Sequence, residues 1–434
     1  MDREEIIKIL TDWNFWIKDL YTGIKRTHYV NKIIQTMNNG FIADVIGVRR
    51  SGKSTIMRQV IKELIYNGLD PRDTLFINFE DPRLGEVSST DLMKIYEVYL
   101  ESVKKSNSRP YIFLDEVQKV KNWENFVRSL HERREAYIAV SGSTSQLSKG
   151  EVSLTLTGRH ITTNVNPLNF IEFISFKNIK FTDLVELVSK ETEIKRYFLE
   201  YLQFGGFPEV VLNKNKEEII LNLYNDILTR DIIERYHVRE ITKLKTIAKY
   251  YLSNTGKLIT LRSVSRGLNI SLSTVERLTN YIKESMIITF IDKIAPSLKI
   301  VERSLRKVYA IDNGLSNIIG FRLKEELGSL LENAVLINLK GKNSMQEIYY
   351  YSGKREVDFI IVQGNNVIDA IQVTWSLSDP LTEKREIDGL LEAMNIFNLN
   401  EGKIITYDEE GNKTFNNRKI KILKAWKWML DLYD

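Results

Sequence analysis

Two glycines, a lysine and a serine form the first segment of the sequence whose spacing could do chemistry. Gly47 opens the pattern G-x-x-x-x-G-K-S, which continues through Gly52 and Lys53 to Ser54. The glycines let the backbone curl so that successive N–H groups face a phosphate, and the lysine can reach the β- and γ-phosphates. The serine hydroxyl is suited to ligate Mg²⁺. The spacing therefore predicts a phosphate-binding loop.

The segments on both sides of this loop agree with that interpretation. The apolar run "FIADVIGV" predicts a buried strand before it, and apolar residues at helical spacing follow until Asn67-Gly68. A chance glycine turn before a helix is the alternative. We expect ATP and Mg²⁺ as cofactors. The expected nucleotide-binding residues are Gly47, Arg49, Arg50, Ser51, Gly52, Lys53, Ser54 and Thr55.

An acidic pair is the second chemical feature. Asp115 and Glu116 follow the apolar run Tyr111 to Leu114. A carboxylate at the end of a parallel strand can orient Mg²⁺, and the next acid can act as general base toward a water that attacks the γ-phosphate. The alternative is an ordinary helix N-terminus, where acidic side chains favour the helix dipole. We expect Ser54 and Asp115 to hold the metal, and Lys53 and Glu116 to act in catalysis.

Further strands must position these groups. The runs "TLFINF", "AYIAVSG" and "HITTNV" are strand-like, which gives five strands alternating with helices. Such alternation predicts an α/β fold with a parallel sheet covered on both faces. Ser143 or Thr144, after the fourth strand, could contact the γ-phosphate or the attacking water. The alternative there is a simple Ser/Gly turn.

Several motifs together resemble a known family. They are "GVRRSGKST", "FLDEVQKVKNWE", "VSGSTSQL", "LTGRHITTNVNPLNFIEF", "YLQFGGFPEVV", "DILTRDIIERY", "KVYAIDNGL" and "KREVDFIIV". This set is similar to the prokaryotic, largely archaeal AAA-like P-loop ATPases that carry a C-terminal domain of uncharacterised function resembling a restriction endonuclease. The resemblance implies that Arg159 contacts a γ-phosphate, in cis or from a neighbouring subunit. A surface arginine that caps a strand is the alternative.

The rest of the chain predicts three more segments after an ATPase core at 1–166. Helical spacing over 167–240 resembles the lid of AAA-type ATPases, with a structural turn at Gly205, Gly206, Phe207 and Pro208. The order of elements over 241–310 resembles a winged helix-turn-helix, whose third helix would enter the DNA major groove. Docking of a protein is the alternative use. The cations that could contact phosphates are Lys257, Arg262, Arg266, Arg277 and Lys283.

The segment 311–434 has the residue order of a restriction-endonuclease-like site, with departures. Glu332 and Asp358 supply two acids, but Gln372 stands where the third acid is expected and Thr374 where the lysine is expected. Glutamine brings no charge and threonine cannot replace an ammonium group. We therefore expect an inactive domain, with Lys354 or Arg355 as replacement cations if it cuts DNA.

Composition excludes several other classes of protein. The 434 residues include no cysteine and four histidines, so disulfides, thiolate metal sites and a zinc site are not expected. No run approaches the ~18 apolar residues of a membrane span, and the acidic start "MDREEIIKIL" is unlike a signal peptide. We expect a cytoplasmic protein. The net charge of +5 permits contact with nucleic acid without demonstrating it.

Three classes of function stay open. The chain could be an ATP-driven switch that acts on DNA or on a partner protein, as a single chain or as a homo-oligomer. It could instead be an ATP-dependent nuclease, or a protein-docking regulator that does not contact nucleic acid. The intact loop and acidic pair predict ATP hydrolysis in all three, whereas Gln372 and Thr374 count against the nuclease.

Overall fold

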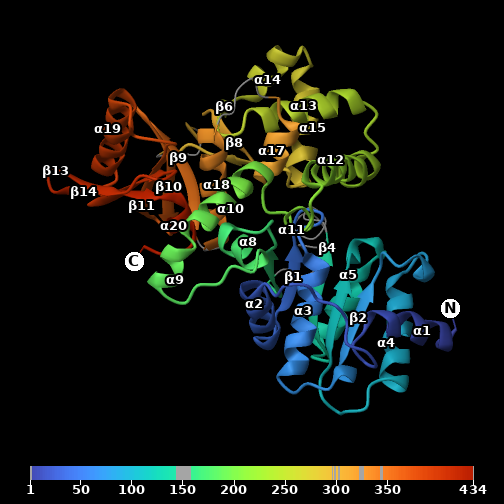
Figure 1. Cartoon of the computed structure of the whole chain (residues 1–434). Coiled ribbons are helices and arrows are strands. Elements are labelled where there is room, and N and C mark those ends of the chain that lie inside the picture. The colour runs from blue at the N-terminus through green and yellow to red at the C-terminus, as the bar shows by residue number, and fades with distance from the viewer. Residues whose placement is uncertain are drawn as a thin grey trace. The chain divides into compact units, whose positions relative to one another are not determined.

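The computed structural model of the chain divides into two compact units, 1–166 and 167–434 (Figure 1). The structure describes residues 2–142, 158–295, 297, 300–301, 304–321, 327–342 and 346–433. None of the helices in these ranges is long and apolar enough to cross a membrane.

The first unit is built on a sheet of five parallel strands in the order β2-β3-β4-β1-β5. The strands are β1 Ile42–Ile46, β2 Thr74–Asn78, β3 Tyr111–Asp115, β4 Tyr137–Gly142 and β5 His160–Asn164. The loop predicted to bind phosphate follows β1, and the acidic pair lies at the end of β3. Since β4 lies between β1 and β3, its carboxyl end lies between the two groups that must act together.

Helices cover both faces of this sheet because the side chains of β1 alternate between two cores. Ile42 and Ile46 pack on the side of α1, α4 and α5, whereas Ala43 and Val45 pack on the side of α2 and α3. This confirms the predicted parallel sheet with two covered faces. The helices are α1 Arg3–Trp13, α2 Thr27–Asn38, α3 Lys53–Tyr66, α4 Ser89–Ser102 and α5 Trp123–Glu132, with short 3-10 turns η1 Pro71–Asp73, η2 Pro82–Leu84 and η3 Val117–Lys119.

The second unit begins with helices. They are α8 Phe170–Phe176, α9 Leu184–Ser189, α10 Glu191–Phe204, α11 Pro208–Leu212 and α12 Lys216–Asp226, which continues into a π-helix, η4 Ile227–Glu234. Three more helices and a small antiparallel sheet of order β6-β8-β7 follow. These are α13 Ile241–Ser253, β6 Leu258–Ile259, α14 Leu261–Leu268, α15 Leu272–Glu284, β7 Ile288–Ile291 and β8 Arg306–Ala310.

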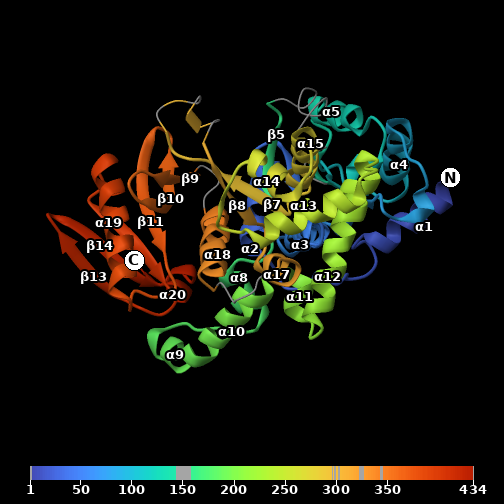
Figure 2. The ribbon, with the colours of Figure 1, turned by 90° about the horizontal axis from the view of Figure 1, so that it is seen from above.

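A mixed six-stranded sheet ends the chain, in the order β13-β14-β12-β11-β10-β9, and it can be followed in Figure 2. Leu390, Ala393 and Met394 of α19 pack on its buried side chains. Its elements, with two preceding helices, are α17 Asn313–Ile319, α18 Leu327–Lys342, β9 Gln346–Ser352, β10 Glu356–Gln363, β11 Asn366–Val373, α19 Pro380–Ile396, β12 Glu401–Thr406, β13 Gly411–Phe415, β14 Arg418–Lys424 and α20 Ala425–Met429.

Candidate active site

The loop between β1 and α3 has backbone conformations that its glycines make possible. Gly52 is left-handed at φ 101°, and a Cβ on Gly47 would lie 2.2 Å from the Val165 carbonyl oxygen. The residue before α3 is Gly52, which has no side chain to cap the helix that begins at Lys53. The first N–H groups of α3 lie at the end of the helix where the dipole favours an anion.

The Lys53 side chain is buried and turned into this loop. Its Nζ donates to the Gly47 carbonyl at 3.0 Å and to the Val48 carbonyl at 3.4 Å, and lies 4.0 Å from Glu116 Oε1. The structure thus brings the loop lysine and the second acid of the pair to one place, although they are far apart in the sequence.

The acidic pair is held by a serine that the sequence analysis passed over. The Ser141 hydroxyl, at the end of β4, donates to Asp115 Oδ1 and accepts from the Glu116 backbone N–H at 3.1 Å. Glu116 itself has a left-handed backbone at φ 55°, and Gln118 Nε2 donates to its Oε2 at 2.6 Å. Ser141 therefore fixes one acid through its side chain and the other through its backbone.

The pKa of Asp115 is raised to about 6, chiefly by burial and also by the nearby Glu116 charge, while hydrogen bonds from Ser141 and Ser54 and the Lys53 charge act in the opposite direction. Only 2% of the Asp115 residue is exposed. The Asp115 carboxylate and the Ser54 hydroxyl beside it supply oxygen ligands, which Mg²⁺ prefers. The uncapped helix, Lys53, Ser54 and Asp115 together fit a Mg²⁺-bound nucleotide.

Arg26 is a further residue that no motif pointed to. Its guanidinium Nη1 donates to the carbonyls of Ser51 and Asn166, both at 3.0 Å, and its backbone N–H donates to Gln59 Oε1 at 3.0 Å. Arg26 is buried. It therefore braces the phosphate loop from the segment before α2.

The other predicted residues of the first unit have varied positions. Arg49 lies 3.9 Å from Glu80, and Arg50 is left-handed at φ 60°. The Arg159 guanidinium pairs with Glu132 of α5 at 3.0 Å. Ser143 and Thr144 lie outside the described residues. Among the described residues, Ser141 and Gln118 contact the acidic pair.

The two acids of the C-terminal domain pair with a lysine that was not among the predicted site residues. Lys307 of β8 places its Nζ 3.0 Å from Glu332 Oε1 and 2.7 Å from Asp358 Oδ1. The sequence indicated Lys354 or Arg355 as a replacement for the lysine missing at Thr374, and the structure adds Lys307 of β8, from outside the segment 311–434. A contact between residues so far apart in sequence leaves no local pattern.

The predicted replacements have other contacts. The backbone N–H groups of Lys354 and Arg355 donate to the Glu392 carboxylate at 2.9 and 3.3 Å. Gln372 accepts from the Asp358 backbone N–H at 3.2 Å and donates its amide to Glu386. Gln372 thus supports Asp358, and its amide is already used in a hydrogen bond.

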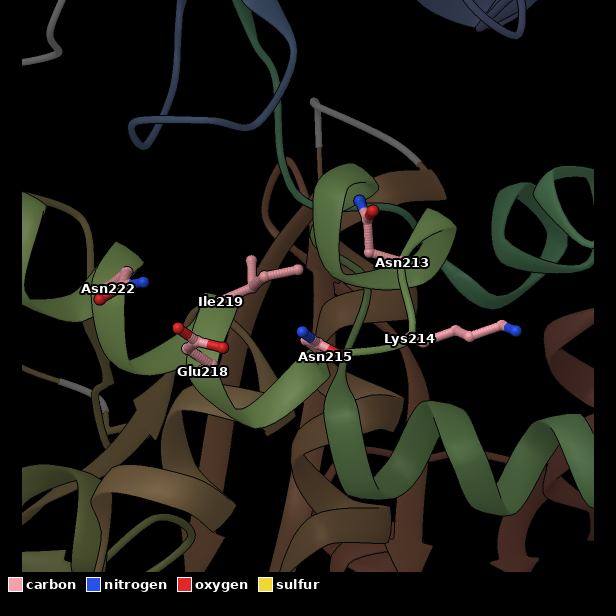
Figure 3. Close-up of a pocket in the computed structure, with 6 residues that line it drawn as sticks. All are labelled: Asn213, Lys214, Asn215, Glu218, Ile219 and Asn222. Carbon is pink, nitrogen blue, oxygen red and sulfur yellow. The ribbon is translucent and has the colours of Figure 1, made fainter.

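A separate hollow of about 450 Å³ lies where α11 meets α12 (Figure 3). In Figure 3 the Lys214 side chain points away from Ile219 and Glu218. The lining residues are Asn213, Lys214, Asn215, Glu218, Ile219 and Asn222. They form no charged set that selects a ligand.

Three models of known protein domains match successive parts of the chain. The model of the AAA domain matches residues 39–174, and two models of domains of unknown function, DUF8612 and DUF4143, match residues 195–325 and 327–428. The uncharacterized protein MJ1544 of Methanocaldococcus jannaschii is 30% identical over 403 residues, which cover 89% of this chain and 87% of that protein.

Two further proteins are similar. An uncharacterized protein of Haemophilus influenzae is 26% identical over 375 residues, covering 85% of this chain and 90% of its own. Among solved structures, a Walker-type ATPase of Pyrococcus abyssi has a TM-score of 0.43 at 13% identity, covering 69% of this chain and 99% of that one.

Proposed function

The chain belongs to the family of prokaryotic AAA-domain proteins that includes MJ1544 of Methanocaldococcus jannaschii, and we propose that it is a Mg²⁺-dependent ATPase that acts as a molecular switch on DNA. The observation that carries the ATPase proposal is the meeting of Lys53, Asp115 and Glu116 at the carboxyl end of the sheet. Lys53 Nζ lies 4.0 Å from Glu116 Oε1, and one serine holds both acids.

Each of these side chains has a distinct task in hydrolysis. The Lys53 ammonium stabilises charge that develops on the transferred phosphoryl group, since this transition state spreads charge over its oxygens. Ser54 and Asp115 would hold Mg²⁺, which supplies further charge stabilisation when it is bound. Glu116 accepts a proton from the attacking water. The backbone N–H groups of the loop orient the phosphates before reaction.

Arg159 is proposed to act in the same reaction. A guanidinium offers planar, paired donors that suit a γ-phosphate. Its ion pair with Glu132 joins two side chains that are 39% and 50% exposed, and such a pair contributes little free energy by itself. The guanidinium would contact the γ-phosphate in its own subunit or in a neighbour.

DNA is the proposed object of the switch because of the order and charge of the elements after α12. Three helices followed by a strand pair, with β6 between the first two helices, are the order of a winged helix, whose third helix here is α15. Arg262 and Arg266 of α14 are exposed. Arg277 of α15 already pairs with Glu240 at 2.8 Å, which leaves it less suited to contact a phosphate.

The test is the ATPase rate with duplex DNA, with single-stranded DNA and without DNA, at two salt concentrations. We expect stimulation that weakens as salt rises, because contact with DNA phosphates releases counterions. Arg262→Ala/Arg266→Ala should lower the salt slope by about 2 if both contact phosphates. Lys384→Ala, on α19, removes an exposed cation elsewhere and should change nothing. An ATPase rate that is the same with and without DNA would favour the alternative, a protein-docking regulator.

A nuclease is the other alternative, and the C-terminal geometry speaks against it. Lys307, the cation that pairs with Glu332 and Asp358 in the described part of the chain, is buried, and Gln372 adds no charge. We expect no cleavage of plasmid or linear DNA with Mg²⁺ or Mn²⁺, with or without ATP. Cleavage that Asp358→Ala abolishes would instead establish the nuclease.

A further inference from the structure

Lys307 has an environment that the proposed ATPase does not explain. Only 2% of this lysine is exposed, and its Nζ contacts three carboxylates, Glu332 Oε1 at 3.0 Å, Glu356 Oε1 at 2.7 Å and Asp358 Oδ1 at 2.7 Å. The lysine comes from β8 of the small antiparallel sheet. The carboxylates come from α18 and from β10 of the six-stranded sheet (Figure 1). One ammonium group thus joins three elements.

The hydrogen bonds of this cluster are well matched to an ammonium ion. An ammonium group has three donors, and three carboxylate oxygens lie within reach of it. The Tyr309 hydroxyl donates to Glu332 Oε1 at 2.6 Å, and the Val373 backbone N–H donates to Asp358 Oδ2 at 2.8 Å. The acids are therefore held by a lysine, a tyrosine and a backbone group, with no further cation needed to satisfy Asp358 or Glu332.

The charges favour a permanently protonated lysine. Burial alone lowers the pKa of a lysine, but here the charges of Asp358, Glu332 and Glu356 outweigh it and hold the pKa of Lys307 well above its usual range. Burial and the Asp358 charge raise the pKa of Glu332 to about 7, although Lys307 acts against this shift. All three carboxylates therefore depend on the single charge of Lys307, whereas the lysine is stabilised by three carboxylates and does not depend on any one of them.

Nζ of Lys307 lies between the three carboxylate oxygens, Glu332 Oε1, Glu356 Oε1 and Asp358 Oδ1. Divalent cations bind carboxylate oxygens at about 2.0–2.6 Å, a little closer than the distances to Nζ. Among the residues that the structure describes, no group of three or more acids, histidines or cysteines is arranged to hold a metal ion. The acids are spaced for an ammonium ion, and a metal at their centre would have to displace Lys307.

We propose that the Lys307 ammonium is the resident cation of the site formed by Glu332, Glu356 and Asp358. By filling this site it keeps divalent metal out of the C-terminal domain, and it fastens β8 to α18 and β10. The site is thus a cation-binding site that the chain closes with its own side chain. Removing the lysine leaves the buried Asp358 and the partly buried Glu332 and Glu356 without their cation, and a divalent cation is the ligand that would then bind.

The test measures Mn²⁺ binding to the nucleotide-free full chain by the loss of the free Mn²⁺ signal in electron paramagnetic resonance, together with the Tm. We expect the natural protein to bind no Mn²⁺ at this cluster, so that Asp358→Asn leaves the amount of bound Mn²⁺ unchanged. Lys307→Met should lower the Tm by at least about 5 °C, since a buried ion pair that loses one partner is strongly destabilising. It should also bind one additional Mn²⁺, which raises the Tm again.

Two variants make this result specific. In Lys307→Met/Asp358→Asn the additional Mn²⁺ should be lost. Lys403→Met is the matched control, because Lys403 pairs with a single carboxylate, Asp369, and is more exposed. It should gain no Mn²⁺.

Two outcomes would overturn the proposal. One is Mn²⁺ bound by the natural protein and lost in Asp358→Asn, which would make the cluster an open metal site. The other is a folded Lys307→Met protein with an unchanged Tm and no additional Mn²⁺. If Lys307→Met does not fold, the comparison of the natural protein with Asp358→Asn decides: absence of an Asp358-dependent Mn²⁺ supports the proposal.

Discussion

Ser141 donates its hydroxyl hydrogen to Asp115, and the same oxygen accepts the backbone N–H of Glu116. The residue is fully buried at the end of β4, the strand between the loop strand and the acid strand. Because it is bonded to both acids, it couples the position of the proposed metal ligand to that of the proposed base. It is a positioning residue, which acts on the reaction through these two acids.

We predict that Ser141→Ala lowers kcat roughly ten-fold and leaves KM for ATP nearly unchanged. Loss of one hydrogen bond to a charged group corresponds to about 1.5 kcal/mol, close to a factor of ten in rate. Ser143→Ala serves as the comparison, since Ser143 was the expected polar contact. A larger loss of kcat in Ser143→Ala than in Ser141→Ala would show that Ser143 is the more important polar residue.

A mixing experiment decides how Arg159 acts. If it contacts a nucleotide in a neighbouring subunit, mixing Arg159→Ala with Lys53→Ala protein should restore part of the ATPase rate, because each subunit supplies what the other lacks. The measurement requires an assembly shown to contain both variants. No restoration in such an assembly would favour a role in cis, or none.

Gly205 is predicted to be intolerant of any side chain. Its φ of 75° and ψ of −162° lie in a region that is almost restricted to glycine. A Cβ there would lie 1.9 Å from Asp312 Oδ1. Gly205→Ala should destabilise the second unit by more than about 2 kcal/mol, measured by chemical denaturation. Gly328→Ala is the control, because nothing lies within 4 Å of its Cβ position. Equal stability of the two variants would contradict this prediction.

Asp312 predicts a specific pH dependence of stability. Burial raises its pKa to about 7, even though the backbone N–H groups of Gly206, Gly314 and Leu315 act in the opposite direction. The native state therefore holds a proton that the unfolded state has lost between about pH 4 and pH 7, so stability falls as the pH rises through this window. The total change is at most about 4 kcal/mol.

The measurement compares the natural protein with Asp312→Asn across this range. The asparagine cannot titrate, so the stability advantage of the natural protein should shrink as the pH rises from about 4 to about 7. A difference that stays constant would show that Asp312 is charged throughout. Measuring the difference between two proteins removes the contributions of the other carboxylates.

The sequence predicted the parts of the site that local patterns encode. The loop of Gly47 to Ser54 and the pair Asp115 and Glu116 each follow an apolar run, so the strand that positions each group is visible beside it. The parallel sheet follows from the alternation of such runs with helices. In the structure these expectations become β1, β3 and α3.

What the sequence could not predict depends on contacts between distant residues. Ser141 and Ser143 have similar surroundings in the sequence, and the contact of Ser141 with Asp115 becomes visible only from the register of β4 beside β3. Arg26 braces the loop from outside every motif. Lys307 meets Glu332 and Asp358 only because β8 lies against α18 and β10, so a search for a lysine near Thr374 could not find it.

Hydrolysis of ATP at the loop, with Glu116 as base, can be tested by one comparison of three proteins. ATP binding and steady-state turnover are measured on the natural protein, on Lys53→Ala and on Glu116→Gln. We predict that Lys53→Ala weakens ATP binding, because the phosphates lose their cation. Glu116→Gln should bind ATP as the natural protein does and lose at least about a hundred-fold in turnover, because only the base is removed. Equal binding and turnover in all three proteins would contradict the account.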